Sequence, residues 1–255
     1  MSQYKNALVT DTSPFAVSEA FKEIRTKMLY TARGDKCPIY AVTSAFSHAG
    51  KSVVIANMAR SFAELGKHVL LIDCDMRNPV QHKIFGLDRS AGISEVAAGL
   101  CRDDDSVILP SGSTGLEVVT AGHIPPNPTE LLASENYRDF LLAMRERYDA
   151  IFVDFPPIGV VVDAVVPVEL ITGYVVVVRS GKDDKRGISD LLATLQRVNA
   201  NVLGFVVNDV NPKLATYRNA SEKYKYKYKY RYNYTYSNRA VEMPAVSPDK
   251  EKEKK

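Results

Sequence analysis

Residues 39–52 read IYAVTSAFSHAGKS, and this stretch decides the fold of the chain. Its first seven residues are mostly apolar, as in a strand buried on both faces of a sheet. A short polar loop follows. The apolar periodicity of residues 52–66, SVVIANMARSFAELG, then predicts a helix that is closed by Gly66. A strand, a loop and a helix in this order form the first unit of an α/β sheet.

Further apolar runs alternate with helical patterns along the chain. They are HVLLIDC at 68–74, LEVVTAG at 116–122, AIFVDFP at 150–156, GYVVVVR at 173–179 and VLGFVVN at 202–208. This alternation predicts an α/β fold with a doubly wound, mostly parallel sheet covered by helices on both faces. Residues 18–33 carry apolar side chains at helical spacing and predict an amphipathic helix before the sheet.

The 255 residues include 33 Lys and Arg and 30 Asp and Glu, which are unevenly distributed. Twelve of the basic and five of the acidic residues lie in 212–255, a net charge of +7, which leaves −4 for residues 1–211. We therefore divide the chain into an N-terminal arm and helix (1–37), a sheet domain (38–211) and a basic, tyrosine-rich tail (212–255). The final SPDKEKEKK is charged and poor in apolar residues, which predicts disorder.

Cysteine spacing and hydropathy exclude several classes of protein. Cys37, Cys74 and Cys101 have no metal-ligand or disulfide-framework spacing, which favours a reducing cytoplasm. Nowhere do about 18 apolar residues run together, and the first fifteen residues lack the blocks of a signal peptide. We expect a soluble chain that reaches a membrane only through a partner.

The loop SAFSHAGKS at 44–52 has the strand and helix context that a phosphate-binding loop requires. Its backbone N–H groups would cradle phosphate oxygens, Lys51 would bridge the β and γ phosphates, and Ser52 would hold Mg²⁺. The loop departs from the GxxxxGK[ST] pattern at Ala45. Taken alone, GKS is equally consistent with a helix N-terminus and an exposed lysine. The predicted nucleotide-binding residues of the loop are Ser47, His48, Ala49, Gly50, Lys51, Ser52 and Val53.

Carboxylates follow two other predicted strands. Asp73 and Asp75 are two residues apart at the end of one strand, so their side chains share a face if the backbone is extended. Asp154 follows the buried run AIFV. The carboxyl ends of parallel strands are where ligands bind in such sheets, and paired carboxylates there need a cation. Together with the loop, these residues predict nucleotide phosphate chemistry.

These motifs resemble those of the bacterial protein-tyrosine kinases of capsule and exopolysaccharide synthesis, a branch of the deviant P-loop ATPases. That family combines a Walker A loop, a Walker A′ motif LIDxDxRxP, a Walker B motif DxPP and a C-terminal tyrosine cluster. Here residues 71–79 match the A′ motif and 154–157 match the B motif. With GISEVAAGL, GHIPPNPTELLAS and GFVVNDV, the resemblance covers about residues 14–236.

The resemblance implies ATP and Mg²⁺ as cofactors and gives the residues roles. Lys51 would neutralise the transferred phosphoryl group, while Ser52, Asp75 and Asp154 would hold Mg²⁺ directly or through water. Asp73 is the candidate base toward a tyrosine hydroxyl. Asn208 matches a family position near the adenine; it could equally be an ordinary asparagine at a strand end.

The P-loop differs from the family pattern. The family reads PGEGKS or PGDGKS where this chain reads SHAGKS, so His48 replaces a glycine. Histidine can adopt a positive φ, but at a cost that glycine does not have. We therefore predict weaker or slower use of ATP than with a consensus loop.

A charged triplet in the N-terminal helix is similar to the family's ExxRxxR oligomerisation motif. Glu19, Lys22 and Arg25 are spaced by three and so share one helix face, which could meet a neighbouring subunit or simply be solvated. Lys22 occupies the middle place, and lysine lacks the bidentate fork of arginine. We expect a homo-oligomer, such as a ring, whose assembly this lysine weakens.

The tail contains seven tyrosines at alternate positions, interleaved with lysine and arginine. They are Tyr224, Tyr226, Tyr228, Tyr230, Tyr232, Tyr234 and Tyr236. An amphipathic edge strand, a nucleic-acid-binding segment and a set of phosphoacceptors are the competing interpretations. We favour phosphoacceptors, because only these are coupled to the ATP site of the same chain.

The predicted function is thus an autokinase that phosphorylates its tail between subunits and regulates polysaccharide export. Family analogy implies a transmembrane adaptor that recruits the chain to the inner face of the membrane, a cognate tyrosine phosphatase and further protein substrates, but no nucleic acid. The first alternative is an ATPase switch of the partition or cell-division type. Such ATPases have a signature lysine at the position of Phe46 and often an apolar C-terminal helix, and this chain has neither. The second alternative is a nucleic-acid-binding P-loop protein, which salt-dependent binding of the tail would reveal.

Overall fold

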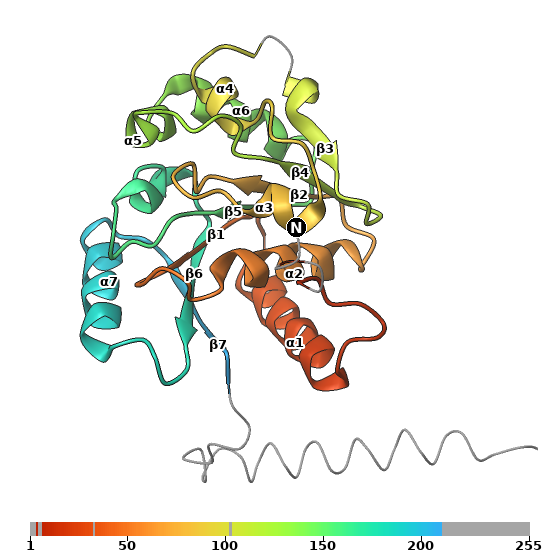
Figure 1. Ribbon diagram of the computed structural model, residues 1–255, viewed down its shortest axis with the longest axis vertical. Helices are drawn as coiled ribbons and strands as arrows, with labels where there is room; N and C mark the ends of the chain where they lie inside the picture. The colour runs from red at the N-terminus through yellow and green to blue at the C-terminus, as the bar shows by residue number, and fades with distance from the viewer. Residues whose placement is uncertain (1–3, 5–6, 33, 102–103, 211–255) are drawn as a thin grey trace, which may run out of the picture. The chain divides into compact units, whose positions relative to one another are not determined.

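Alternating strands and helices dominate the computed structural model, which describes residues 4, 7–32, 34–101 and 104–210 (Figure 1). The strands are β1 (Ile39–Ser44), β2 (Val69–Asp73), β3 (Ile108–Pro110), β4 (Leu116–Val119), β5 (Ala150–Asp154), β6 (Gly173–Arg179) and β7 (Val202–Asn208). The α-helices are α1 (Phe15–Thr31), α2 (Lys51–Ala63), α3 (Gln81–Phe85), α4 (Ile93–Ala97), α5 (Pro128–Leu132), α6 (Glu135–Arg145) and α7 (Lys185–Arg197). Short 3-10 helices cover η1 (Asp104–Val107), η2 (Asp163–Val165) and η3 (Val168–Leu170).

The strands form one sheet in the order β3-β4-β2-β5-β1-β6-β7. Every neighbouring pair is parallel except β3 and β4. The six predicted strands and the mostly parallel sheet are confirmed. The antiparallel edge strand β3 was not predicted, because three residues ending in Pro110 are too short to give an alternating pattern. Proline is tolerated there because an edge strand has one unpaired side.

Side chains of the central strands alternate between two apolar layers, one on each face of the sheet. In β1, Tyr40 and Val42 pack with α2, whereas Ile39 and Ala41 belong to the layer that includes residues of α6 and α7. All four side chains are fully buried. Burial on both faces explains why the central strands read as continuous apolar runs. The result is a helix, sheet and helix sandwich, with α7 and α2 on opposite sides of the sheet (Figure 1).

The N-terminal arm and α1 pack on the outer side of α2. The Asn57 side chain of α2 accepts a hydrogen bond from Val9 N at 2.6 Å and donates one to Ala7 O at 2.9 Å. One carboxamide therefore satisfies a backbone N–H group and a backbone C=O group of the arm, as a neighbouring strand would. The predicted N-terminal helix is confirmed, although it begins at Phe15, directly after Pro14.

The sheet order brings the three motif-bearing strands side by side. β5 lies between β2 and β1, and Asp73 pairs in register with Asp154. Because the strands are parallel, their carboxyl ends meet at one edge of the sheet.

Among the described residues, no helix is long and apolar enough to cross a membrane. The tail lies outside the described residues, so the division of the chain into three parts stays a prediction.

Candidate active site

The loop between β1 and α2 turns through two residues with left-handed backbone conformations. His48 has a φ of 62°, and Gly50, which immediately precedes α2, has a φ of 87°. His48 therefore adopts a left-handed conformation that favours glycine, at a cost of about 1 kcal/mol or more. A Cβ atom on Gly50 would also clash with the Asn208 side chain, so space as well as φ requires glycine there.

Asn208 supports this loop from the last strand of the sheet. Its Nδ2 donates a hydrogen bond to Ala49 O at 3.0 Å, which joins residues 159 positions apart in the chain. The contact to adenine predicted from the family resemblance stays a prediction. In the structure the side chain holds the P-loop backbone, so it is more than an ordinary strand-end asparagine.

The P-loop is also joined to the segment after β5. Thr43 Oγ1 donates a hydrogen bond to Pro156 O at 2.8 Å, and Ile158 N donates one to Ser44 O at 2.9 Å. A Cβ atom on Gly159 would clash with Ala45 O. The first glycine of the P-loop pattern is Ala45 in this chain, and the close backbone approach there is made possible by Gly159 instead.

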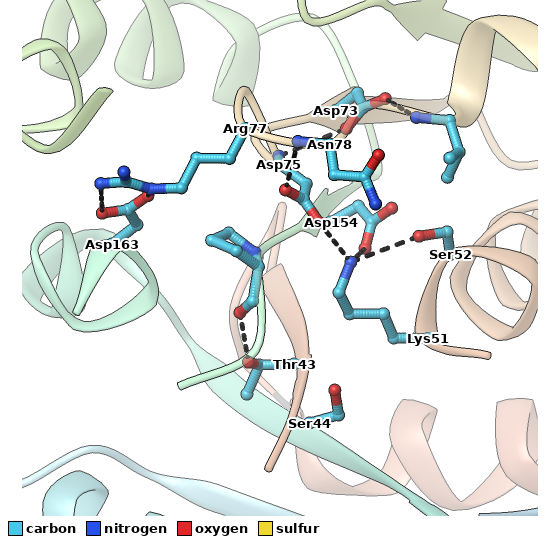
Figure 2. A network of polar contacts seen from close by, with 12 residues as sticks. Thr43, Ser44, Lys51, Ser52, Asp73, Asp75, Arg77, Asn78, Asp154 and Asp163 are labelled. Carbon is cyan, nitrogen blue, oxygen red and sulfur yellow. Dashed lines mark hydrogen bonds and ion pairs between the residues drawn. The ribbon is translucent and has the colours of Figure 1, made fainter. Parts of the chain in front are cut away.

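Lys51 lies at the centre of a buried charge cluster (Figure 2). Its Nζ donates a hydrogen bond to Asp75 Oδ2 at 2.7 Å and lies 3.5 Å from Asp154 Oδ1 and 3.4 Å from Ser52 Oγ. Burial opposes the charge on the lysine, but the Asp154 and Asp75 carboxylates outweigh it and raise the Lys51 pKa. Only 8% of the residue is exposed. The structure thus brings together four of the predicted site residues and excludes the alternative of an exposed lysine.

Asp73 is fully buried and organises the backbone after β2. Its Oδ2 accepts hydrogen bonds from Val80 N at 3.1 Å and Gln81 N at 2.9 Å, and its Oδ1 accepts one from Asp75 N at 3.3 Å. Burial, followed by the charge of Asp154, raises the Asp73 pKa to about 8. Both carboxylate oxygens are occupied in this conformation, so a role as base would require at least one of these bonds to open. That role stays a prediction.

Asp154 is held on one oxygen and open on the other. Its Oδ2 accepts a hydrogen bond from Gln81 Nε2 at 2.8 Å, whereas its buried Oδ1 makes no hydrogen bond within the described part of the chain. Burial raises the pKa of Asp154, and the charge of Lys51 counteracts this rise. Gln81 was not among the predicted site residues, because no motif pattern marks it.

These side chains fit a magnesium ion that is bound together with a nucleotide. Two carboxylates, Asp75 and Asp154, lie within ion-pair distance of the Lys51 ammonium group, so with both ionised these three side chains carry one negative charge in excess. Within the residues described, no group of three or more Asp, Glu, His or Cys side chains could hold a metal by itself. An Mg²⁺ ion does not need such a group, because it is usually held by one or two carboxylates, water and substrate phosphates.

A second ion pair holds the A′ segment from its outer side. Arg77 Nε and Nη2 donate to the two oxygens of Asp163 at 2.8 and 3.0 Å (Figure 2). Thr129 Oγ1 also donates a hydrogen bond to Asp163 Oδ1, at 2.8 Å. The hydrogen bonds to Asp163 raise the Arg77 pKa. Sequence reasoning placed Arg77 in a motif but missed its partner, since Asp163 belongs to none of the recognised patterns.

The predicted oligomerisation residues make contacts within the chain. Lys22 Nζ pairs with Glu19 Oε1 at 3.0 Å, and Lys22 also lines a cavity of about 430 Å³ between the arm, α1 and α2. Arg25 Nη1 donates to Ser61 O at 2.6 Å, and only 13% of its side chain is exposed. Arg25 thus packs α1 on α2, and a role in assembly stays a prediction. The seven predicted phosphoacceptor tyrosines lie outside the described residues.

Comparisons with known proteins agree with this geometry. Residues 40–236 match the family profile of the CobQ/CobB/MinD/ParA nucleotide binding domain. The chain is 33% identical to the tyrosine-protein kinase YwqD of Bacillus subtilis over 81% of this chain and 87% of that protein. The crystal structure of the chimerical protein CapA2B2 is 32% identical, with a TM-score of 0.73, over 78% of this chain and 86% of that one. The structure of the kinase domain of the Escherichia coli tyrosine kinase ETK is 29% identical, with a TM-score of 0.71, over 80% of this chain and 84% of that one.

Proposed function

Because the chain belongs to the CobQ/CobB/MinD/ParA nucleotide-binding family, and within it to the bacterial tyrosine-protein kinases, we propose that it transfers the γ-phosphoryl group of MgATP to its own tail tyrosines. One observation carries this proposal. The buried Lys51 ammonium group is fixed between Asp75 and Asp154 at the base of a P-loop. Phosphoryl transfer needs little covalent help from a protein and depends on positioning and charge stabilisation, which such a cluster supplies.

Each residue of the cluster has a role in this reaction. The P-loop N–H groups and the N-terminus of α2 hold the phosphate oxygens, and Lys51 exchanges a carboxylate partner for the transferred group. When bound, Mg²⁺ neutralises charge on the β and γ phosphates, and Ser52, Asp75 and Asp154 would hold it directly or through water. Asp73 orients the incoming tyrosine hydroxyl and accepts its proton once a backbone hydrogen bond opens.

The seven tail tyrosines are the first substrates in this proposal. Each phosphotyrosine adds roughly −1.5 to −2 charges, so seven would add about −10 to −14 and reverse the tail's net charge of +7. Tyr224 follows Asn211 by thirteen positions, which span at most about 43 Å at roughly 3.3 Å each. This reach supports transfer into the site of a neighbouring subunit.

A membrane setting completes the proposal. A transmembrane adaptor would recruit the chain to the inner face of the membrane and stimulate it, and a tyrosine phosphatase would reset the tail. Phosphorylation would thereby regulate the synthesis and export of capsular or extracellular polysaccharide. The chimerical relative CapA2B2 is consistent with a partner protein of this kind.

The side chain at the signature position argues against an ATPase switch of the partition type. Phe46 stands at the place of the signature lysine, and its ring packs so closely on α7 that a Cβ atom on Gly187 would clash with it. An apolar side chain packed in this way cannot reach the phosphates of a second subunit as a lysine would. The structure therefore gives no support to the switch alternative.

Mass spectrometry of the incubated protein tests the proposal. The purified chain is incubated with MgATP and the cytoplasmic segment of its adaptor, and phosphotyrosine is mapped. We expect phosphate on Tyr224 to Tyr236, and none in a Lys51→Met chain alone. Absence of tail phosphotyrosine in the unaltered chain would refute kinase activity toward the tail.

A mixing experiment separates transfer between subunits from transfer within one. The Lys51→Met chain supplies the tail, and an active chain that ends at Asn211 supplies the site. Label on the Lys51→Met tail is the expected result. An unlabelled tail, with the full-length active chain labelled in parallel, would rule out transfer between subunits.

A further inference from the structure

Gln81, the first residue of α3, contacts all three nucleotide motifs. Its backbone N donates to Asp73 Oδ2 at 2.9 Å, in the A′ motif. Its side-chain Nε2 donates to Ser52 O at 3.0 Å, in the P-loop helix, and to Asp154 Oδ2 at 2.8 Å, in the B motif. Gln81 is fully buried. One residue therefore joins the ends of β2 and β5 to the start of α2.

The orientation of the Gln81 amide follows from its surroundings. Ser52 O is a carbonyl and can only accept a hydrogen bond. The NH₂ group must therefore face Ser52 O, and its second hydrogen points to Asp154 Oδ2. The opposite orientation would place three acceptor oxygens together in a buried site, with no donor between them.

Two acceptor atoms on this pair of side chains lack a hydrogen bond, although the Lys51 ammonium group lies 3.5 Å from one of them, Asp154 Oδ1. Asp154 Oδ1 and Gln81 Oε1 are both buried and make no hydrogen bond with any described residue. Buried polar atoms in native proteins nearly always have a partner, protein or water. The water molecules around a bound Mg²⁺ ion are donors of the kind that such acceptors need.

We infer that Gln81 is a positioning residue, which fixes Asp154 through Oδ2 and thereby presents Oδ1 to a nucleotide-bound Mg²⁺ ion and its water. This inference rests on the proposed function. Without the amide donor, Asp154 Oδ2 loses the 2.8 Å hydrogen bond that fixes it, and the carboxylate can rotate relative to Lys51. Partners that orient metal ligands are commonly worth 10- to 100-fold in metal affinity.

The test is the Mg²⁺ dependence of nucleotide binding, which requires no phosphoryl transfer. A fluorescent ADP analogue is titrated into the full chain in excess EDTA and at increasing Mg²⁺ concentrations. The variant Gln81→Met keeps the length of the side chain but removes both donors. Gln196→Met makes the same exchange at an exposed position of α7 and serves as the matched control.

Mg²⁺ should enhance binding of the ADP analogue. For Gln81→Met we expect the Mg²⁺ concentration that gives half of the maximal enhancement to rise about tenfold or more. Affinity in EDTA should stay within about twofold of the unaltered chain, because the phosphate-binding backbone is retained. Gln196→Met should match the unaltered chain in both measurements. If Gln81→Met does not fold, as judged by circular dichroism, Gln81→Leu is measured in its place with the same expected result.

Three outcomes would overturn the inference. An unchanged Mg²⁺ midpoint in a folded Gln81 variant would mean that the residue does not position Asp154. An equal loss of affinity in EDTA and in Mg²⁺ would mean that Gln81 only supports the fold of the site. If the unaltered chain itself binds the nucleotide without any Mg²⁺ dependence, the proposed function fails, and the inference fails with it.

Discussion

The charge of individual buried side chains governs the behaviour of the site. Lys51 is the positive centre of a cluster in which Asp73 and Asp154 have raised pKa values because burial disfavours their charged forms. Asp75 is the closest partner of Lys51, at 2.7 Å. A ligand that brings a divalent cation therefore relieves repulsion among the carboxylates while its phosphates compete for Lys51.

His48 provides a test of strain at the level of one residue. Its φ of 62° is unfavourable for any residue with a Cβ atom, so His48→Gly should lower the cost of the nucleotide-binding conformation. We expect the affinity for an ADP analogue to rise up to about fivefold, equivalent to about 1 kcal/mol, and autophosphorylation to become faster. Ser47→Gly, which adds flexibility at a neighbouring residue without a positive φ, should not improve either property. Unchanged affinity and rate in His48→Gly would contradict this account.

The cysteines should respond to pH in a way set by burial. Burial raises the Cys37 pKa to about 12, and it also raises the pKa of Cys74. At pH 8 about one Cys37 thiol in ten thousand is then ionised, so iodoacetamide should label the partly exposed Cys101 first. The unfolded chain releases these thiol protons at lower pH than the native one, so the free energy of unfolding should fall as the pH rises above about 9.

Mass spectrometry of the native and the urea-unfolded chain checks this expectation. All three cysteines should be labelled after unfolding. Labelling of Cys37 at the rate of Cys101 in the native chain would show that the first strand is not packed as described.

At the level of elements, α1 is fixed to α2 by a partly buried arginine. Arg25 Nη1 donates to Ser61 O at 2.6 Å, and Arg25→Ala would leave that carbonyl without its charged donor. We expect the free energy of unfolding to fall by about 1.5–3 kcal/mol, as for other hydrogen bonds to charged groups. The measurement is urea unfolding at a concentration where the chain is monomeric.

Lys27→Ala is the matched control on the same helix. Lys27 pairs with Glu23 at 3.0 Å, but 72% of its side chain is exposed, so its loss should change the free energy of unfolding by at most about 0.5 kcal/mol. If Arg25 acted only between subunits, both variants would unfold alike.

Predictability also differs between elements. β1, β2, β5 and β6 could be predicted because burial gives continuous apolar runs. The edge strand β7 has an equally apolar sequence and could be predicted too, although its residues are only partly buried or exposed. The antiparallel β3 could not, because its pairing with β4 comes from tertiary contact and not from a pattern of its own. In the site, motif spacing identified Lys51 and the three aspartates, whereas Gln81 and Asp163 act through contacts that only the folded chain creates.

For the whole molecule, both apolar layers of the sheet are complete before the tail begins. Every buried apolar side chain described lies in residues 28–195, and residues up to Val210 form one compact unit. A chain that ends at Asn211 should therefore unfold at the same urea concentration, with the same denaturant dependence, as the full chain. Circular dichroism at increasing urea concentrations measures both quantities. A lower midpoint for the shortened chain would show that the tail contributes to the stability of the sheet domain.

The insertion of β5 between β2 and β1 has a consequence for synthesis on the ribosome. The chain makes β1 and β2 first, yet these strands do not pair with each other. β2 pairs with β4, about 45 residues further along, but the strand that joins β1 to β2 is β5, which is made about 110 residues after β1. Such long-range pairing slows folding and leaves apolar strands exposed meanwhile. The nascent chain therefore cannot complete its nucleotide site until Asp154 has left the exit tunnel.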